Sequence, residues 1–166
     1  MNMNMNINIF GSTGIIGSKS IEILIKFFPK YKINLLVAGN NYKKIIIQTN
    51  KYNPRAIHVN DSTKISIIKK NISSSVKILN KKDLSAYLQN TKSMATIFAI
   101  SGYESINYLE DVLINTSNLG LVNKECIVSC GHLFKKLFKK HNVNLFPLDS
   151  EHFSIYNLIN KDLKNI

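Results

Sequence analysis

The sequence predicts an α/β protein with a doubly wound, largely parallel sheet. Two observations predict this class. Short apolar runs typical of buried strands alternate along the chain with segments whose apolar residues recur at helical spacing. The segments between successive strands are also long enough for right-handed crossovers. In such sheets ligands bind at the carboxyl ends of the strands, so the residues that follow each strand carry the functional information.

The expected strands are short and rich in Ile, Val and Leu. Residues 33–38 form an almost continuous apolar run, as expected for a strand buried on both faces. In chain order, strands are predicted at 7–10, 33–38, 56–59, 76–79, 95–100, 119–122 and 143–148.

The expected helices fill the intervals between these strands. Residues 15–28 place Ile16, Ile21, Leu24 and Phe28 at helical spacing and stop at Pro29. The other predicted helices cover 42–51, 62–71 with Asp61 or Ser62 as N-cap, 84–89, 103–114, 125–140 with a break at Gly131, and a segment from 152 onward.

Composition excludes several classes of protein. The 166 residues are 45% hydrophobic and contain no run long enough to span a membrane, which excludes a disordered chain and a membrane-spanning helix. Cys126 and Cys130 cannot build a disulfide framework, and the N-terminus has no secretory signal pattern, so a cytoplasmic location is expected.

The net charge of +12 raises the alternative of a basic nucleic-acid-binding domain. Nearly all of the excess is lysine, Arg55 is the only arginine, and Asn and Ile are also heavily used. These three residue types share A/T-rich codons, and base recognition favours arginine. Compositional drift is therefore the favoured interpretation, with no nucleic-acid or membrane partner.

A glycine-rich loop follows the first strand directly. Gly11, Gly14 and Gly17 form a G-x-x-G-x-x-G pattern that opens a helix. Glycines allow a tight turn and close approach of a pyrophosphate, whose charge then lies at the helix N-terminus. The loop therefore predicts a Rossmann-like dinucleotide site rather than a purely structural turn.

The second strand ends at Gly39-Asn40-Asn41, without the carboxylate that NAD-specific sites usually offer to the ribose. Asn donors and the nearby Lys43 or Lys44 would accept a 2′-phosphate, so NADPH is favoured over NADH. The alternative is an ordinary polar turn.

Two further motifs follow later strands. In Asn123-Lys124-Glu125, Asn123 could simply cap the next helix. In Asp149-Ser150-Glu151-His152, the acidic residues could cap a helix, or two carboxylates could converge on Mg²⁺ or Mn²⁺. Adjacent like charges would raise the pKa of at least one of these two carboxylates.

Read in order, the glycine loop, Val37 to Asn41, Asn123-Lys124-Glu125 and Pro147 to His152 together resemble 1-deoxy-D-xylulose 5-phosphate reductoisomerases. The resemblance implies an oxidoreductase of isoprenoid precursor biosynthesis by the methylerythritol phosphate route. Such an enzyme uses NADPH and a divalent metal to isomerise and reduce this phosphorylated sugar to 2-C-methyl-D-erythritol 4-phosphate, and it forms homodimers.

The resemblance also implies a role for each matching residue. Gly11 belongs to the loop described above. Thr13, Gly14, Ile15 and Ile16 would contact the cofactor phosphates, and Gly39, Asn40 and Asn41 the adenosine ribose. Asn123 and Glu125 would contact the cofactor, Lys124 and Ser150 the substrate, and Asp149 and Glu151 the metal. Lys124 would also be catalytic.

Three positions depart from the family pattern: Cys126, Asn40 and the turn at 101–104. Residues 1–148 are expected to form the NADPH-binding domain and 149–166 the beginning of the metal- and substrate-binding catalytic domain. The sequence is expected to be truncated at the start of the catalytic domain, so that the third metal ligand of the family is missing. It would then be a fragment, a truncated product or a decayed gene, with weak or no activity on its own. A non-catalytic NADPH-binding remnant is the alternative.

Overall fold

The fold is built around one parallel sheet. The computed structural model describes residues 5–102 and 105–162, and for 124–130 and 160–162 it describes the backbone alone. The strands are β1 (Asn6–Phe10), β2 (Lys32–Ala38), β3 (Ala56–Val59), β4 (Lys77–Leu79), β5 (Ser93–Phe98), β6 (Thr116–Leu121) and β7 (Asn144–Pro147). They lie in the order β4-β3-β2-β1-β5-β6-β7, and every pair is parallel.

This strand order creates a switch point beside β1. The chain winds outward from β1 to β4, returns to place β5 on the other side of β1, and then winds outward again to β7. Crevices for ligands form where the winding direction reverses, at the carboxyl ends of the strands. The sheet therefore places the loops after β1 and β5 side by side, and the predicted α/β class with a Rossmann-like sheet is confirmed.

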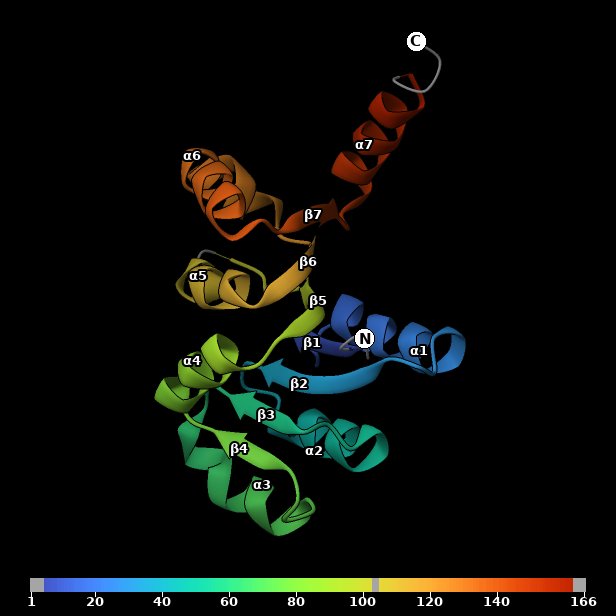
Figure 1. Cartoon of the computed structure of the whole chain (residues 1–166). Coiled ribbons are helices and arrows are strands. Elements are labelled where there is room, and N and C mark those ends of the chain that lie inside the picture. The colour runs from blue at the N-terminus through green and yellow to red at the C-terminus, as the bar shows by residue number, and fades with distance from the viewer. Residues whose placement is uncertain (1–4, 103–104, 163–166) are drawn as a thin grey trace.

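Helices cover both faces of the sheet. They are α1 (Ile15–Phe27), α2 (Tyr42–Tyr52), the 3₁₀ turn η1 (Ser62–Lys64), α3 (Ile65–Asn71), α4 (Lys81–Asn90), α5 (Ile106–Ile114), α6 (Lys124–His141) and α7 (Ser150–Asp162). Figure 1 shows α1 and α2 on one side of the sheet and α4, α5 and α6 on the other.

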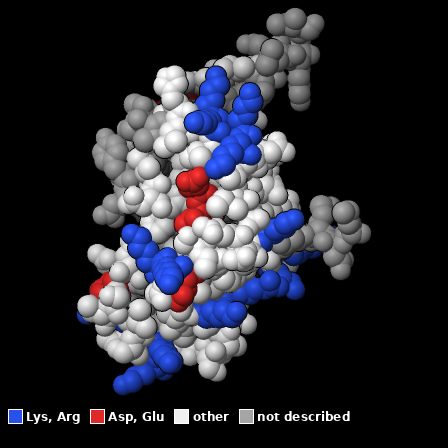
Figure 2. All heavy atoms as spheres, turned by 60° about the vertical axis from the view of Figure 1, so that its left-hand side comes forward, with Lys and Arg blue, Asp and Glu red and all other residues white. Residues whose placement is uncertain are grey.

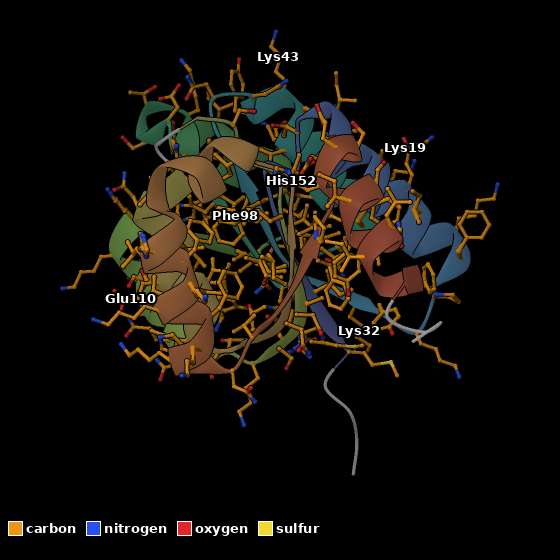
Figure 3. All side chains as sticks on the ribbon, turned by 90° about the horizontal axis from the view of Figure 1, so that it is seen from above. Lys19, Lys32, Lys43, Phe98, Glu110 and His152 are labelled. Atoms are coloured by element: carbon orange, nitrogen blue, oxygen red, sulfur yellow. The ribbon has the colours of Figure 1, made fainter. Side chains whose placement is uncertain are left out.

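The core consists of two apolar layers, one on each face. Ile21 of α1, Ile45 of α2 and Ile68 of α3 are fully buried in one layer. The other layer receives α4, α5 and α6, and the rings of Phe10 and Phe98 lie 5.3 Å apart within it. Figure 3 shows Phe98 in the interior and the labelled lysines at the rim.

A line of buried polar side chains crosses four strands inside the second layer. Asn34 donates to the amide oxygen of Asn8 at 2.8 Å and accepts from the Tyr87 hydroxyl at 2.8 Å. Asn8 approaches the Thr96 hydroxyl at 3.5 Å, and Thr96 bonds to Thr116 at 2.7 Å. The register between β1 and β2 shifts where Asn8 and Asn34 meet. We refer to these five residues as the polar ladder.

Several predicted helix bounds differ from the structure by a few residues, and two of the differences have a clear physical cause. The break expected at Gly131 is wrong, because α6 runs continuously from Lys124 to His141. One glycine costs a helix about 1 kcal/mol, which the packing of Phe134 and Leu137 offsets. Helix α4 begins at Lys81 rather than Leu84, since the Asn80 side chain caps the backbone N–H of Asp83.

The lysines do not merge into one basic surface on the face shown in Figure 2, where carboxylates lie between separate groups of lysines. Among the helices of the described residues, none combines the length and apolarity that a bilayer span requires.

Candidate functional site

The glycine loop turns sharply between β1 and α1. Gly11 has a φ of +73°, and a Cβ there would lie 2.2 Å from the carbonyl oxygen of Ala99 on the neighbouring β5 loop. Both the left-handed conformation and the close approach require glycine at this position. The loop can therefore lie flat against β5 at the switch point.

The N-terminus of α1 is left open toward this crevice. Gly14 is its N-cap and supplies no side chain, and the first turn contains no acidic residue. Thr13 is half-buried, while Ile15 is 90% exposed and Ile16 also faces solvent. The uncapped N–H groups and the positive end of the helix dipole suit an anionic group such as a pyrophosphate.

A buried glutamine supports the loop from behind. The Gln48 amide on α2 donates to the carbonyl oxygen of Ser12 at 2.7 Å, and the Ser18 hydroxyl donates to the same oxygen at 3.0 Å. Gln48 is 5% exposed. Sequence reasoning missed this residue, although a glutamine on the buried stripe of α2, beside Ile45 and Thr49, is the signal that could have found it.

The first cavity, of about 300 Å³, lies at the carboxyl ends of four strands. It brings together several predicted residues with others that were not predicted. Its lining consists of Gly11, Gly14, Val37, Ala38, Gly39, Asn40, Asn60, Ala99, Ile100 and Ser101. The predicted glycine loop and the predicted turn after β2 thus face one space.

The turn after β2 presents polar groups without a carboxylate. Asn40 and Lys43 are exposed, and Figure 3 shows Lys43 extending outward from the fold. The Asn41 side chain accepts from the backbone N–H of Lys44 at 3.1 Å and caps α2. The side-chain oxygen of Asn41 therefore has a structural role. Of these two asparagines, only Asn40 lines the cavity.

Asn123 fastens the loop after β5. Its side chain is buried, and its amide nitrogen lies 3.0 Å from the carbonyl oxygen of Ile100 and 2.9 Å from that of Gly102. It also contacts the Ser105 hydroxyl at 3.2 Å. Asn123 thereby ties the end of β6 to the loop that lines the cavity.

Lys124 and Glu125 form the first residues of α6 directly after Asn123, but their side chains lie outside the described part of the structure, as does that of Cys126. Tyr103 and Glu104, which complete the unusual turn at 101–104, also lie outside it.

A second cavity, of about 260 Å³, adjoins the first. It is lined by Ala99, Ile100, Ser101, Val122, Asn123, Asp149 and Glu151. The first three of these residues also line the cavity beside the glycine loop. A ligand that fills both spaces would therefore run along the loop after β5 from the glycine loop to the two carboxylates.

Asp149 acts as a helix cap in the structure. Its Oδ1 accepts from the backbone N–H of His152 at 2.9 Å, and both of its oxygens lie within 2.9 Å of the His152 imidazole. Burial by itself would raise the pKa of Asp149, but these hydrogen bonds outweigh it and lower the pKa. A raised pKa was expected for at least one of the two carboxylates, and Asp149 is not that one.

The two carboxylates contribute hard oxygen donors to one cavity, as Mg²⁺ prefers, and Asp149 keeps lone pairs beyond those used by His152. Glu151 is exposed and accepts from the Ser150 hydroxyl at 3.0 Å. Within the described residues no group of three His, Cys, Asp or Glu side chains converges. The two carboxylates are therefore suited to be two of the ligands of a magnesium ion whose other ligands are water.

Comparisons with known proteins agree on one family. A family model described as 1-deoxy-D-xylulose 5-phosphate reductoisomerase matches residues 7–131. Curated proteins of that name are similar over nearly the whole chain. The one from Pelagibacter ubique is 36% identical over 96% of this chain and 42% of its own length. The one from Wigglesworthia glossinidia brevipalpis is 31% identical over 95% of this chain and 41% of its own.

Solved structures share the fold. The reductoisomerase from Zymomonas mobilis in complex with NADPH matches with a TM-score of 0.82 at 24% identity, over 92% of this chain and 40% of that chain. A complex with NADPH, fosmidomycin and magnesium matches with a TM-score of 0.79 at 23% identity, over 89% of this chain and 37% of that chain. The chain thus spans about two fifths of the length of these relatives.

Proposed function

Because the chain belongs to the 1-deoxy-D-xylulose 5-phosphate reductoisomerase family, we propose that it binds NADPH in the first cavity. The pyrophosphate would lie at the N-terminus of α1, against Gly11, Thr13, Gly14, Ile15 and Ile16. The solved relative in complex with NADPH, which has the same fold, supports this assignment.

The adenosine ribose would lie at Gly39-Asn40-Asn41. The absence of a carboxylate there favours a 2′-phosphate, and Asn40, the N-terminus of α2 and Lys43 offer positive or donating groups to it. The preference for NADPH over NADH should reach about tenfold or more, because charge-assisted hydrogen bonds contribute roughly 1.5–3 kcal/mol.

Calorimetric titration of the chain with both cofactors tests this proposal. Gly14→Val is the matched control, since a β-branched side chain would occupy the space of the pyrophosphate and abolish binding of both. Equal affinities for NADPH and NADH would contradict the assignment of the turn after β2.

We further propose that this segment serves the NADPH- and metal-dependent isomerisation and reduction of 1-deoxy-D-xylulose 5-phosphate to 2-C-methyl-D-erythritol 4-phosphate. The observation that carries the proposal is the shared wall of the two cavities, which sets the carboxylates beside the cofactor crevice. Asp149 and Glu151 would hold the divalent metal, and Ser150 would bind the substrate.

Bound metal would supply Lewis acidity at the sugar's carbonyl and hydroxyl oxygens, and NADPH would supply the hydride. The chain's own residues would position these groups. Asn123 holds the loop after β5 in place at the junction of the cavities. Lys124 would place its ammonium near the developing oxyanion, and Glu125 would contact the cofactor.

Binding of Mn²⁺ tests the metal half of the proposal. Two carboxylates should hold Mn²⁺ weakly, and electron paramagnetic resonance should show weaker binding in Glu151→Gln while NADPH affinity is retained. Asp149→Asn should weaken Mn²⁺ binding as well. Unchanged Mn²⁺ affinity in both variants would favour helix capping as the sole role of this motif.

The remaining assignments belong to the same proposal. Residues 1–148 would form the cofactor domain and 149–166 the start of the catalytic domain, with α7 packing chiefly on β7. The substrate partner would be a small phosphorylated sugar, the assembly a homodimer, and the compartment the cytoplasm, where NADPH is the usual reductant and the two cysteines stay reduced.

A further inference from the structure

Asn60 lies directly after β3 and lines two cavities at once. One is the proposed cofactor cavity beside the glycine loop. The other, of about 450 Å³, lies beyond the end of β3 and is also lined by His58 and Tyr108. Asn60 therefore stands between the proposed cofactor crevice and a polar space next to it.

One end of the Asn60 amide is held by two side chains from different elements. The Asn60 Oδ1 position lies 3.1 Å from Nε2 of His58 on β3 and 3.0 Å from the hydroxyl of Tyr108 on α5. His58 is 3% exposed, and its ring packs edge-on against Tyr108 at 6.5 Å. Tyr108 also packs on Phe10 at 5.8 Å. The amide is thus fixed in position although Asn60 itself is exposed.

The hydrogen bond on the far side of the imidazole determines which end of the amide is held. His58 Nδ1 lies 2.8 Å from the backbone carbonyl oxygen of Leu79, and a carbonyl can only accept. A neutral imidazole that donates from Nδ1 has only an acceptor at Nε2. Nε2 then requires a hydrogen-bond donor. The nitrogen and oxygen of an amide can be exchanged by a half-turn of the group, so we place the amide nitrogen of Asn60 at the position that faces Nε2.

The Tyr108 hydroxyl oxygen accepts a hydrogen bond from the second hydrogen of that amide nitrogen, since a hydroxyl can accept as well as donate. His58 and Tyr108 both line the larger cavity, so the held end of the amide faces that side. The carbonyl oxygen at the opposite end of the amide takes no part in these two contacts, which leaves it as an acceptor for the cofactor cavity that Asn60 also lines.

We propose that Asn60 determines base specificity, its side-chain oxygen accepting a hydrogen bond from the exocyclic amino group of adenine. This inference rests on the proposed binding of NADPH. The pyrophosphate at α1 and the ribose at the end of β2 direct the base toward the end of β3, the next strand in the sheet. His58 and Tyr108 act as positioning residues, since they touch Asn60 and hold its amide.

The test compares NADPH with its 6-deamino analogue, in which hypoxanthine replaces adenine and an oxygen acceptor replaces the amino donor. The chain should bind NADPH about tenfold more tightly than the analogue, the usual effect of one hydrogen bond between neutral groups. In Asn60→Ala the ratio of the two affinities should fall to about one.

Tyr108→Phe tests the positioning role. It keeps the ring packing on Phe10 and His58 but frees the amide, so the ratio should fall while thermal stability stays nearly unchanged. Asn40→Ala is the control, because it should weaken both cofactors equally and leave the ratio unchanged.

The outcomes separate this inference from the function on which it rests. Tight binding of NADPH with equal or tighter binding of the deamino analogue would overturn the role of Asn60 and leave the proposed function standing. Failure of NADPH itself to bind, in a chain that circular dichroism shows to be folded, would overturn the proposed function and this inference with it.

Discussion

Replacing Gly17 by alanine should destabilise the fold, although alanine is the better helix former. A Cβ at Gly17 would lie 2.2 Å from the carbonyl oxygen of Gly11 and 2.8 Å from Ser12 Cα. The first distance is more than about 1 Å shorter than ordinary contact, and both neighbours are backbone atoms that cannot rotate away. The start of α1 must therefore move away from the loop that it closes.

The cost can be set against the gain in helix propensity. Inserting one methyl group into a packed region typically costs 1–3 kcal/mol, and a Cβ only 2.2 Å from a backbone oxygen belongs to the upper part of that range, about 2–3 kcal/mol. Replacing glycine by alanine in a helix recovers about 1 kcal/mol. We expect a net loss of about 1–2 kcal/mol, which lowers the melting temperature by roughly 2–8 °C for a domain of this size. Affinity for NADPH should also fall, because the loop that faces the pyrophosphate is displaced.

Gly131→Ala is the matched control. Gly131 lies inside α6, and a Cβ there meets nothing within 4 Å. The same substitution should therefore stabilise the chain by about 0.5–1 kcal/mol and leave cofactor affinity unchanged. Thermal and urea unfolding followed by circular dichroism would measure both variants. A Gly17→Ala chain as stable as the parent would refute the packing argument.

Three further predictions concern single side chains. Asn41→Ala should cost about 1 kcal/mol of stability through loss of the α2 cap, whereas Asn40→Ala should leave the melting temperature unchanged; equal effects would contradict the division of roles between them. Because the pKa of Asp149 is lowered on folding, the stability that its ionised form contributes is full above the unfolded pKa of about 3.9 and is lost as the pH falls through the folded value. The stability gap to Asp149→Asn, which keeps a capping oxygen but carries no charge, should therefore narrow between pH 5 and pH 2 in urea titrations, and a constant gap would argue against the lowered pKa. Gln48→Met should weaken NADPH binding about three- to tenfold by freeing the glycine loop while changing unfolding free energy by under about 1 kcal/mol, which calorimetry and urea titration would check together.

The sequence was most informative where a residue type is required by local geometry. The glycine loop and the apolar strands could be predicted because Gly11 must adopt a positive φ and because a strand buried on both faces must be apolar. Parallel pairing then places the ends of all strands at one edge, so the predicted cluster of site residues followed from topology alone.

Contacts between distant segments could not be predicted in the same way. Gln48 and Ser12 lie 36 positions apart, and nothing local to either one indicates that they meet. Asn123 was expected either to cap a helix or to contact a cofactor, whereas the structure shows its amide fastening the loop after β5. Such pairings depend on how helices pack on the sheet, which the spacing of apolar residues only partly specifies.

The polar ladder restricts how the sheet can assemble. The apolar residues of β1 and β2 are buried on both faces of the sheet, so a shift of one strand along the other would by itself cost little hydrophobic burial. A slip by one residue would separate Asn8 from Asn34 and leave both amides buried without partners, at a cost of roughly 1–3 kcal/mol for each unsatisfied group. The ladder therefore penalises misaligned sheets during folding more than it stabilises the correct one.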